Sequence, residues 1–327
     1  METKRPTVAA AEEILGLYCP VLDHGFVALI DYMGTDDSIE RAARVSYGYG
    51  TRKQSQTRGL IRYLRRLLHT TPSEMVEFKV HCAMPIFVAR QWIRHRTASV
   101  NEYSGRYSLM PLLFYRPERT QVASQSNANR QGREAEGVSD EVYRLAVERW
   151  EEARAAAADA YEWLLAEDVA RELARIDLPL STYTQWYWKI DLHNLIHFLT
   201  LRVDPHAQWE IQQFGRAMAG MLKRVAPLSY EAWIDYQVCG SRVSHGELEA
   251  LRRLLEVRDG ALAARAEADP LGPEELAELG LSKREVRELL EKLEPKERPD
   301  FELDLDALRT PEEFEERLAR AVPGDFE

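Results

Sequence analysis

The aromatic residues of this chain end abruptly at one point in the sequence. All seven tryptophans and all fourteen tyrosines lie before Ser241, and residues 241–327 contain three phenylalanines as their only aromatics. Aromatic side chains bury large apolar areas, so their distribution indicates where a core can form. We therefore predict a folded domain over residues 1–240 and an extension of different character over residues 241–327.

The net charge changes at the same point. Residues 241–327 hold 14 Lys and Arg against 24 Asp and Glu, a net charge of −10, whereas residues 1–240 hold 29 against 30, a net charge of −1. Spaced leucines after Ser244 and the Thr-Pro-Glu-Glu segment 310–313 predict short amphipathic helices. We expect an acidic helical appendage or an oligomer contact, whose negative surface would repel nucleic acid.

The composition predicts a cytoplasmic globular protein. With 45% hydrophobic and 30% charged residues, the chain can build a sizeable core, and no uncharged run approaches the ~18 residues of a membrane span. Glu12 and Glu13 interrupt any apolar signal segment. The three cysteines, Cys19, Cys82 and Cys239, are too widely spaced for a disulfide framework or a zinc knuckle and fit a reducing compartment.

Hydrophobic periodicity within residues 1–240 predicts both strands and helices. A run of apolar residues predicts a strand at 26–30, and alternating apolar residues predict another at 76–82. The polar segment 124–133 is predicted to be a loop. Apolar residues at helical spacing predict helices at 37–45, 60–68, 85–93, 139–166, 168–177, 192–203 and 206–222.

The residues with most capacity for chemistry lie in the segment 91–108. Three arginines, one histidine and one glutamate fall within fifteen residues of it. Guanidinium groups stay charged when buried and present planar forks of donors, so this cluster suits a phosphate or diphosphate. The alternative is a solvated basic turn, which fits poorly because Trp92, Ile93, Tyr103 and Tyr107 are interleaved with the charges.

A second cluster follows in the segment 189–210. His193 and His197 are four residues apart and lie on one helix face, and Arg202 can point toward the same pocket from the helix end. A metal site with His206 as a third ligand is the alternative. Asn194 stands where a zinc protease needs its glutamate, so we favour a polar helix face or ligand contacts and predict no metal.

Other nucleotide and nucleophile motifs are missing. Gly48-Tyr49-Gly50 lacks the third glycine of a dinucleotide fingerprint, and the chain has no Gly-x-x-x-x-Gly-Lys-Ser/Thr segment. Ser104 would need an adjacent base to act as a nucleophile. His95 is the nearest candidate in the sequence, and spacing alone does not place it beside Ser104. A nucleic-acid-binding module is disfavoured by the charge balance of residues 1–240.

The segment Arg94-His95-Arg96, followed after seven residues by Ser104, resembles the signature of the flavin-dependent thymidylate synthases. The resemblance extends over residues 24–237, with several further blocks in family order. These blocks are Arg41–Ser46, Thr71-Pro72-x-Glu74, Pro85–Trp92, Ala174-Arg175-x-x-Leu-Pro179 and Leu201-Arg202-x-Asp-x-His206-Ala-Gln-Trp-Glu-Ile211.

This resemblance implies an α+β fold, with an antiparallel sheet flanked by helices, in a homotetramer whose active sites lie between subunits. It implies synthesis of dTMP from dUMP, with methylenetetrahydrofolate as carbon donor, reduced FAD as hydride source and NADPH as reductant of the flavin. An inactive homologue that still binds nucleotide and flavin is the alternative. The presence of Ser104, Arg106 and Arg202 argues against it.

The resemblance also implies the roles of individual residues. FAD contacts are expected from Ser46, Thr71, Glu74, Arg94, His95, Arg96, Glu102, Asp191, His193 and His197. The dUMP site is expected to comprise Gln91, Trp92, Ile93, Arg94, Glu102, Tyr103, Ser104, Gly105, Arg106, Arg175 and Arg202.

Three arginines of the dUMP set have particular expected roles. Arg106 and Arg175 are expected to bind the phosphate. Arg202 is the expected catalytic residue, because a fixed cation at the uracil edge stabilises the negative charge that develops as N3 ionises.

Overall fold

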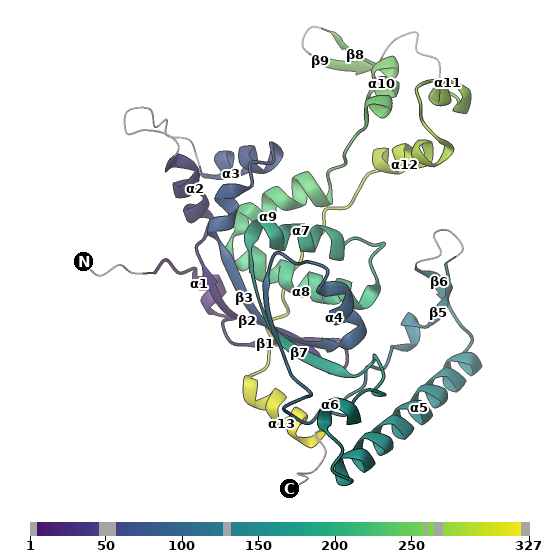
Figure 1. Ribbon diagram of the computed structural model, residues 1–327. Coiled ribbons are helices and arrows are strands. Elements are labelled where there is room, and N and C mark those ends of the chain that lie inside the picture. The colour runs from purple at the N-terminus through teal and green to yellow at the C-terminus, as the bar shows by residue number, and fades with distance from the viewer. Residues whose placement is uncertain (1–4, 46–56, 127–131, 259–260, 265–270, 322–327) are drawn as a thin grey trace. The chain divides into compact units, whose positions relative to one another are not determined.

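The computed structural model describes residues 5–45, 57–126, 132–258, 261–264 and 271–321 (Figure 1). The chain forms two compact units, Met1–Trp233 with Asp300–Glu327, and Ile234–Pro299. The single boundary expected near residue 240 is therefore corrected. The C-terminal residues expected in the extension return to the first unit, because Phe301 packs on Trp233 with their ring centroids 5.8 Å apart.

The first unit is built on a five-stranded antiparallel sheet with the order β1-β2-β3-β7-β4. Its strands are β1 (Tyr18–Val21), β2 (Gly25–Met33), β3 (Glu77–Pro85), β7 (Tyr183–Asp191) and β4 (Ser99–Glu102). The predicted strand 26–30 is confirmed as part of β2, and the predicted strand 76–82 is confirmed as β3, which begins one residue later. Strand β7 was not predicted, although its side chains alternate as in a half-buried strand: Trp186 and Trp188 are buried, and Tyr187 between them is exposed.

One face of the sheet carries the core beneath the helices α4 (Ile86–Trp92), α7 (Leu192–Arg202) and α8 (Trp209–Val225). Trp92 of α4 is fully buried, and its ring lies 5.5 Å from Trp186 and 5.3 Å from Trp188, centroid to centroid. Phe198 of α7 and Phe214 of α8 complete this aromatic cluster. The result is an α+β fold with helices flanking an antiparallel sheet.

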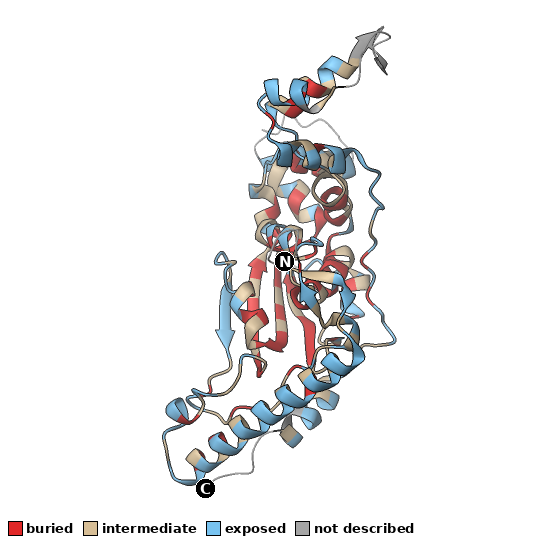
Figure 2. Cartoon of the chain, turned by 90° about the vertical axis from the view of Figure 1, so that its right-hand side faces the viewer, coloured by how far each residue is buried: buried red, intermediate tan, exposed pale blue. Residues whose placement is uncertain are grey.

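The remaining elements of the first unit surround this core. They are α1 (Ala9–Glu12), α2 (Asp36–Val45), α3 (Thr57–Arg66), the 3-10 helix η1 (Thr71–Met75), the 3-10 helix η2 (Arg119–Gln121), β5 (Ala123–Gln125), β6 (Arg133–Gly137), α5 (Asp140–Ala166), α6 (Arg171–Ala174), α9 (Pro227–Trp233) and α13 (Pro311–Ala321). Most of α5 is exposed along its length (Figure 2). None of the helices in the described ranges is both long and apolar enough to cross a membrane.

Most helices predicted in residues 1–240 are confirmed to within a few residues, with two differences. The helix predicted at 206–222 begins only at Trp209, because Asp204 Oδ1 accepts the backbone N–H of His206 at 2.8 Å and forms a turn. The helix predicted at 168–177 shortens to α6, preceded by Asp168 at a positive φ of 56°. The flanks of the segment predicted as a loop pair as the β5–β6 hairpin, and residues 127–131 lie outside the described residues.

The second unit has its own small core. Its elements are η3 (Ile234–Val238, a π-helix), α10 (His245–Leu254), β8 (Leu255–Arg258), β9 (Ala261–Ala264), α11 (Pro273–Glu278) and α12 (Lys283–Leu293). The predicted helix after Ser244 is confirmed, because Ser244 and Glu247 form a reciprocal capping box. Glu247 is also buried against Lys292, whose Nζ donates to its carboxylate at 2.5 Å.

Candidate active site

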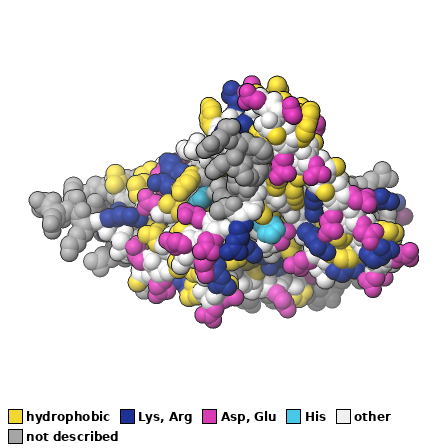
Figure 3. Space-filling view, turned by 90° about the horizontal axis from the view of Figure 1, so that it is seen from below, with side chains coloured by type: hydrophobic (Ala, Val, Ile, Leu, Met, Phe, Trp, Pro, Cys, Tyr) yellow, Lys and Arg dark blue, Asp and Glu magenta, His cyan; other side chains and the backbone are white. Residues whose placement is uncertain are grey.

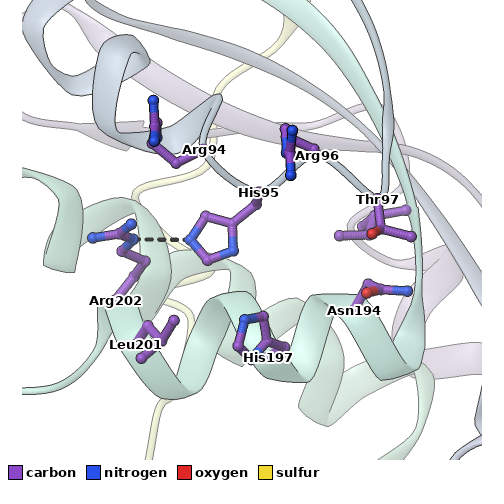
Figure 4. Close-up of a pocket in the computed structure, with 9 residues that line it drawn as sticks. Arg94, His95, Arg96, Thr97, Asn194, His197, Leu201 and Arg202 are labelled. Carbon is purple, nitrogen blue, oxygen red and sulfur yellow. Dashed lines mark hydrogen bonds between the residues drawn. The ribbon is translucent and has the colours of Figure 1, made fainter.

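A cavity of about 310 Å³ lies between the residues that follow α4 and the exposed side of α7 (Figure 4). Three arginines and two histidines line it, and its lining contains no carboxylate. This set of donors suits an anionic ligand, because nothing within the lining neutralises the guanidinium charges. The lining residues are Arg94, His95, Arg96, Thr97, Ile190, Asn194, His197, Leu201 and Arg202.

The end of α4 places the motif Arg94-His95-Arg96 at the cavity. Trp92 is 0% exposed and anchors the helix in the core, so the turn that follows it carries residues 94–96 outward. The backbone N–H of His95 donates to the carbonyl of Trp92 at 3.0 Å and closes this turn. The expectation that Trp92 binds substrate is corrected, because its side chain belongs to the aromatic core.

Helix α7 supplies the opposite wall. Asp191 caps this helix: its carboxylate accepts the backbone N–H of Asn194 at 2.9 Å and the side-chain amide of Asn194 at 2.7 Å. Asn194 and His197, three residues apart, then reach the same cavity from one helix face. Of the three predicted α7 contacts, His197 lines the cavity, whereas Asp191 and His193 do not.

His95 and Arg202 form the central contact of the cavity. Arg202 Nε donates to His95 Nε2 at 3.1 Å (Figure 4). Arg202 Nη2 donates to the carbonyl of Gln91 at 3.4 Å. Burial, reinforced by the charges of Arg202 and His197, lowers the pKa of His95 to about 4. His95 is therefore neutral at neutral pH, with Nε2 as acceptor and the proton on Nδ1.

The second group of predicted residues surrounds the Ser104 loop, which we define as residues 103–110. Two hydrogen bonds attach the start of this loop to β7: Tyr103 N–H donates to Gln185 O at 2.8 Å, and Thr184 Oγ1 donates to the Glu102 carboxylate at 2.8 Å. The carbonyl of Ser104 accepts the backbone N–H groups of residues 107 and 108 at 3.1 and 3.0 Å, which closes a tight turn.

Gly105 allows this loop to pack closely against Arg175. A Cβ atom at Gly105 would lie 2.9 Å from Cδ of Arg175 and 2.6 Å from Sδ of Met110, so a larger residue would displace both. Arg106 points elsewhere: its Nε donates to Glu172 at 2.9 Å in an exposed ion pair. The two expected phosphate-binding arginines, Arg106 and Arg175, thus both lie at the Ser104 loop. Arg106 already has an anionic partner in Glu172.

The predicted site is divided between these two places. Gln91, Arg94 and Arg202 lie at or beside the cavity, whereas Tyr103 to Arg106 belong to the Ser104 loop. Arg175, at the end of α6, packs against Gly105 of that loop. Across the described ranges, no hydrogen bond or ion pair joins the cavity lining to the Ser104 loop. Ile93, the C-cap of α4, is 37% exposed beside the cavity motif.

The other expected FAD contacts in the described part of the chain lie outside the cavity lining. Thr71 and Glu74 belong to η1, and the backbone N–H of Leu192 at the start of α7 donates to Val76 O, just after η1, at 2.7 Å. Ser46 lies outside the described residues.

Sequence reasoning missed four members of the cavity lining. They are Thr97, Ile190, Asn194 and Leu201. Asn194 and Leu201 carried a usable signal, because they stand three before and four after His197 on the predicted helix. Ile190 belongs to β7, which was not predicted, so no signal pointed to it.

The fold and the cavity together define an α+β protein with a cationic cavity whose donors suit an anionic ligand. The family model described as "Thymidylate synthase complementing protein" matches residues 28–228. The flavin-dependent thymidylate synthase of Rickettsia bellii is 49% identical over 265 residues, which cover 77% of this chain and 90% of the relative. That of Gluconobacter oxydans is 52% identical over 256 residues, covering 77% and 84%.

Solved structures agree with these relatives. The crystal structure of a UMP/dUMP methylase from Streptomyces cacaoi, bound with 5-Br UMP, is 33% identical and superposes with a TM-score of 0.61. The match covers 67% of this chain and 98% of that one. The chain belongs to the family of flavin-dependent thymidylate synthases.

Proposed function

We propose that this protein is a transferase that methylates dUMP to dTMP, with FAD as cofactor, methylenetetrahydrofolate as carbon donor and NADPH as reductant. The observation that carries the proposal is the cavity built on Arg94-His95-Arg96, lined by three arginines without a carboxylate. It lies within the region that matches the family. The named relatives are flavin-dependent thymidylate synthases, and the structural neighbour is a UMP/dUMP methylase.

The donor set of the cavity fits FAD. Guanidinium groups of Arg94 and Arg96 match the charge and geometry of a diphosphate, and Asn194 adds neutral hydrogen-bonding capacity. His95 and His197 would lie beside the bound group. When bound and reduced, FAD supplies the hydride of the reaction.

The hydrogen bonds of Arg202 support its role as the catalytic residue. Its guanidinium is held by two neutral acceptors, His95 Nε2 and Gln91 O, so its orientation is set while its charge is left uncompensated. A cation fixed in this way stabilises the negative charge that develops on the pyrimidine as N3 ionises, which makes C5 nucleophilic. Because the donor is oriented before substrate arrives, little reorganisation is needed during the reaction.

Ser104 is a substrate-binding residue in this proposal, and no enzyme nucleophile is required. Its Oγ accepts the backbone N–H of Arg106 at 3.3 Å, and its carbonyl closes the turn of the loop. Neither contact is with a base that could activate the hydroxyl. The loop would instead present Ser104 and Arg106 to the nucleotide.

The proposed assembly is a homotetramer with active sites between subunits. The division of the dUMP set between the cavity and the Ser104 loop supports it, because one subunit would supply each half. We also place the protein in the cytoplasm. Its three cysteines, Cys19, Cys82 and Cys239, are all free thiols, which supports a reducing compartment.

Anaerobic absorption spectroscopy tests this function. The purified protein is titrated with FAD, reduced with NADPH in the presence of dUMP labelled with tritium at C5, and then mixed with methylenetetrahydrofolate. We expect bound flavin to bleach and to reoxidise as tritium is released and dTMP appears. Bound flavin and dUMP without tritium release would establish the alternative, an inactive homologue.

A further inference from the structure

The last described residues of the chain return from the second unit to the first. Phe301 is 7% exposed, and its backbone N–H donates to the Tyr230 hydroxyl at 2.9 Å. Lys223 Nζ donates to Asp300 at 2.6 Å, next to this contact. These contacts hold the start of a segment that we name the C-terminal clasp, residues 300–321.

The clasp then joins the edge of the sheet. Tyr18 of β1 and Arg309 exchange two backbone hydrogen bonds of 2.8 and 2.9 Å, which form an antiparallel bridge beside β1. Helix α13 follows directly and lies near the sheet in Figure 1. Its Phe314 packs against Phe26 of β2, with ring centroids 4.2 Å apart at 72°. This is the sheet face opposite the aromatic core, because Phe26 pairs with Ala83 whereas Trp186 pairs with Cys82.

The same clasp reaches the Ser104 loop near both of its ends. Phe314 lines a small cavity together with Tyr103, Thr184 and Gln185, the residues that attach the start of the loop to β7. Beyond the far end of the loop, the backbone N–H of Leu112 donates to the carbonyl of Ala321 at 2.8 Å. The clasp therefore shares a cavity with the start of the loop and forms a hydrogen bond just beyond its end.

We propose that the C-terminal clasp positions the Ser104 loop for dUMP, with Phe314 as the positioning residue. This inference rests on the proposed function of the loop in binding dUMP. A loop that carries ligand contacts binds more tightly when its conformation is set in advance, because less entropy is lost on binding. None of the contacts described for the clasp involves the cavity proposed to hold FAD, so the clasp acts on the loop half of the dUMP site rather than on flavin.

The test uses the full-length protein with Phe314→Ala, Phe314→Leu and Arg309→Pro, each compared with the unaltered chain. Proline at 309 removes the N–H that donates to Tyr18 without opening a cavity. Leu290→Ala, at an exposed apolar position of α12 in the second unit, is the matched control. Readouts are amide hydrogen exchange of residues 103–112, the Kd and KM of dUMP, kcat, flavin content and Tm.

We expect Phe314→Ala to speed hydrogen exchange at residues 103–112 and to raise the Kd and KM of dUMP about tenfold, with kcat and flavin content nearly unchanged. Arg309→Pro should act in the same direction, Phe314→Leu should restore most of the affinity, and Leu290→Ala should change none of the readouts. Unchanged exchange and unchanged Kd in Phe314→Ala would overturn the proposal.

Two further results would overturn the proposed role of the clasp. A parallel loss of Tm, flavin and dUMP affinity in both Phe314 variants would overturn the proposal, because it would show support of the fold alone. If the unaltered chain binds no dUMP although exchange responds to Phe314→Ala, the proposed function fails, and the role of the clasp in dUMP binding fails with it.

Discussion

The cavity and the Ser104 loop both present arginines, but their arginines have different partners. Arg202 is held by a neutral imidazole and a backbone carbonyl, and no carboxylate lines its cavity. Arg106, whose side chain is 58% exposed, is paired with the carboxylate of Glu172. Arg202 therefore has no anionic side chain to give up, whereas a ligand anion at Arg106 would have to displace Glu172.

The distribution of charged side chains on the surface is consistent with the pairing of Arg106 with a carboxylate. On the face shown in Figure 3, acidic and basic side chains are interspersed, so an exposed arginine has carboxylates within reach. A site that depends on uncompensated positive charge needs a lining without carboxylates, and the lining of the cavity has none. We expect four substitutions, two in the cavity and two at the Ser104 loop, to distinguish the roles of these two places.

Removing the charge of Arg202 from the cavity should have the largest effect on turnover. Arg202→Ala is expected to lower kcat by about 10²- to 10³-fold, because the developing charge on the pyrimidine loses its fixed partner. Flavin content should be retained, since Arg94 and Arg96 remain. Release of tritium from C5 of dUMP measures the effect, and a rate equal to that of the unaltered protein would exclude Arg202 as the catalytic residue.

Removing the charge from the loop should affect binding more than turnover. Arg106→Ala is expected to raise the KM of dUMP about tenfold with a smaller change in kcat, because a phosphate contact is lost while the chemistry at the uracil remains. Deoxyuridine, which lacks the phosphate, provides the control, because its weak binding should not change. Equal losses of affinity for dUMP and deoxyuridine would contradict a phosphate-binding role.

His95, the neutral partner of Arg202, should make the stability of the folded protein depend on pH. The pKa of His95 in the folded protein is lowered to about 4 from its ordinary 6.5, so the unfolded chain binds more protons in this window. His95 therefore makes the folded state lose stability as the pH falls from 6.5 toward 4. His95→Gln keeps an acceptor for Arg202 without a titrating group.

We expect the Tm of His95→Gln to fall less than that of the unaltered protein between pH 6.5 and 4, and its kcat at pH 8 to drop only a few fold. His206→Gln is the matched control, because His206 is exposed and makes its contact with Asp204 outside the cavity. Parallel Tm profiles for His95→Gln and the unaltered chain would show that His95 does not titrate in this way.

The smallest effect is expected from the substitution of Glu172, the ion-pair partner of Arg106. Glu172→Gln should lower the KM of dUMP about twofold, because an exposed ion pair contributes only ~0–1 kcal/mol and its removal frees Arg106 for the ligand. The difference should shrink at high salt, which screens the pair in the unaltered protein. An unchanged or raised KM would mean that Glu172 does not compete with the substrate.

Much of the site was predictable because its parts are local in the sequence. Arg94, His95 and Arg96 are adjacent, and His197 and Arg202 share one helix whose apolar spacing is regular. The family could be inferred from such blocks and their order. The cap at Ser244 was equally local, since a capping box spans four residues.

What the sequence by itself determined was therefore the set of chemical groups, the helices that carry them and the family to which the chain belongs. Only the tertiary structure decided which groups meet. It buried Trp92 in the core, set His95 against Arg202 across 107 residues of chain, and returned Phe314 to the sheet from beyond a second unit. Periodicity reports neighbours along one helix or strand, whereas these contacts depend on how separate elements pack against one another.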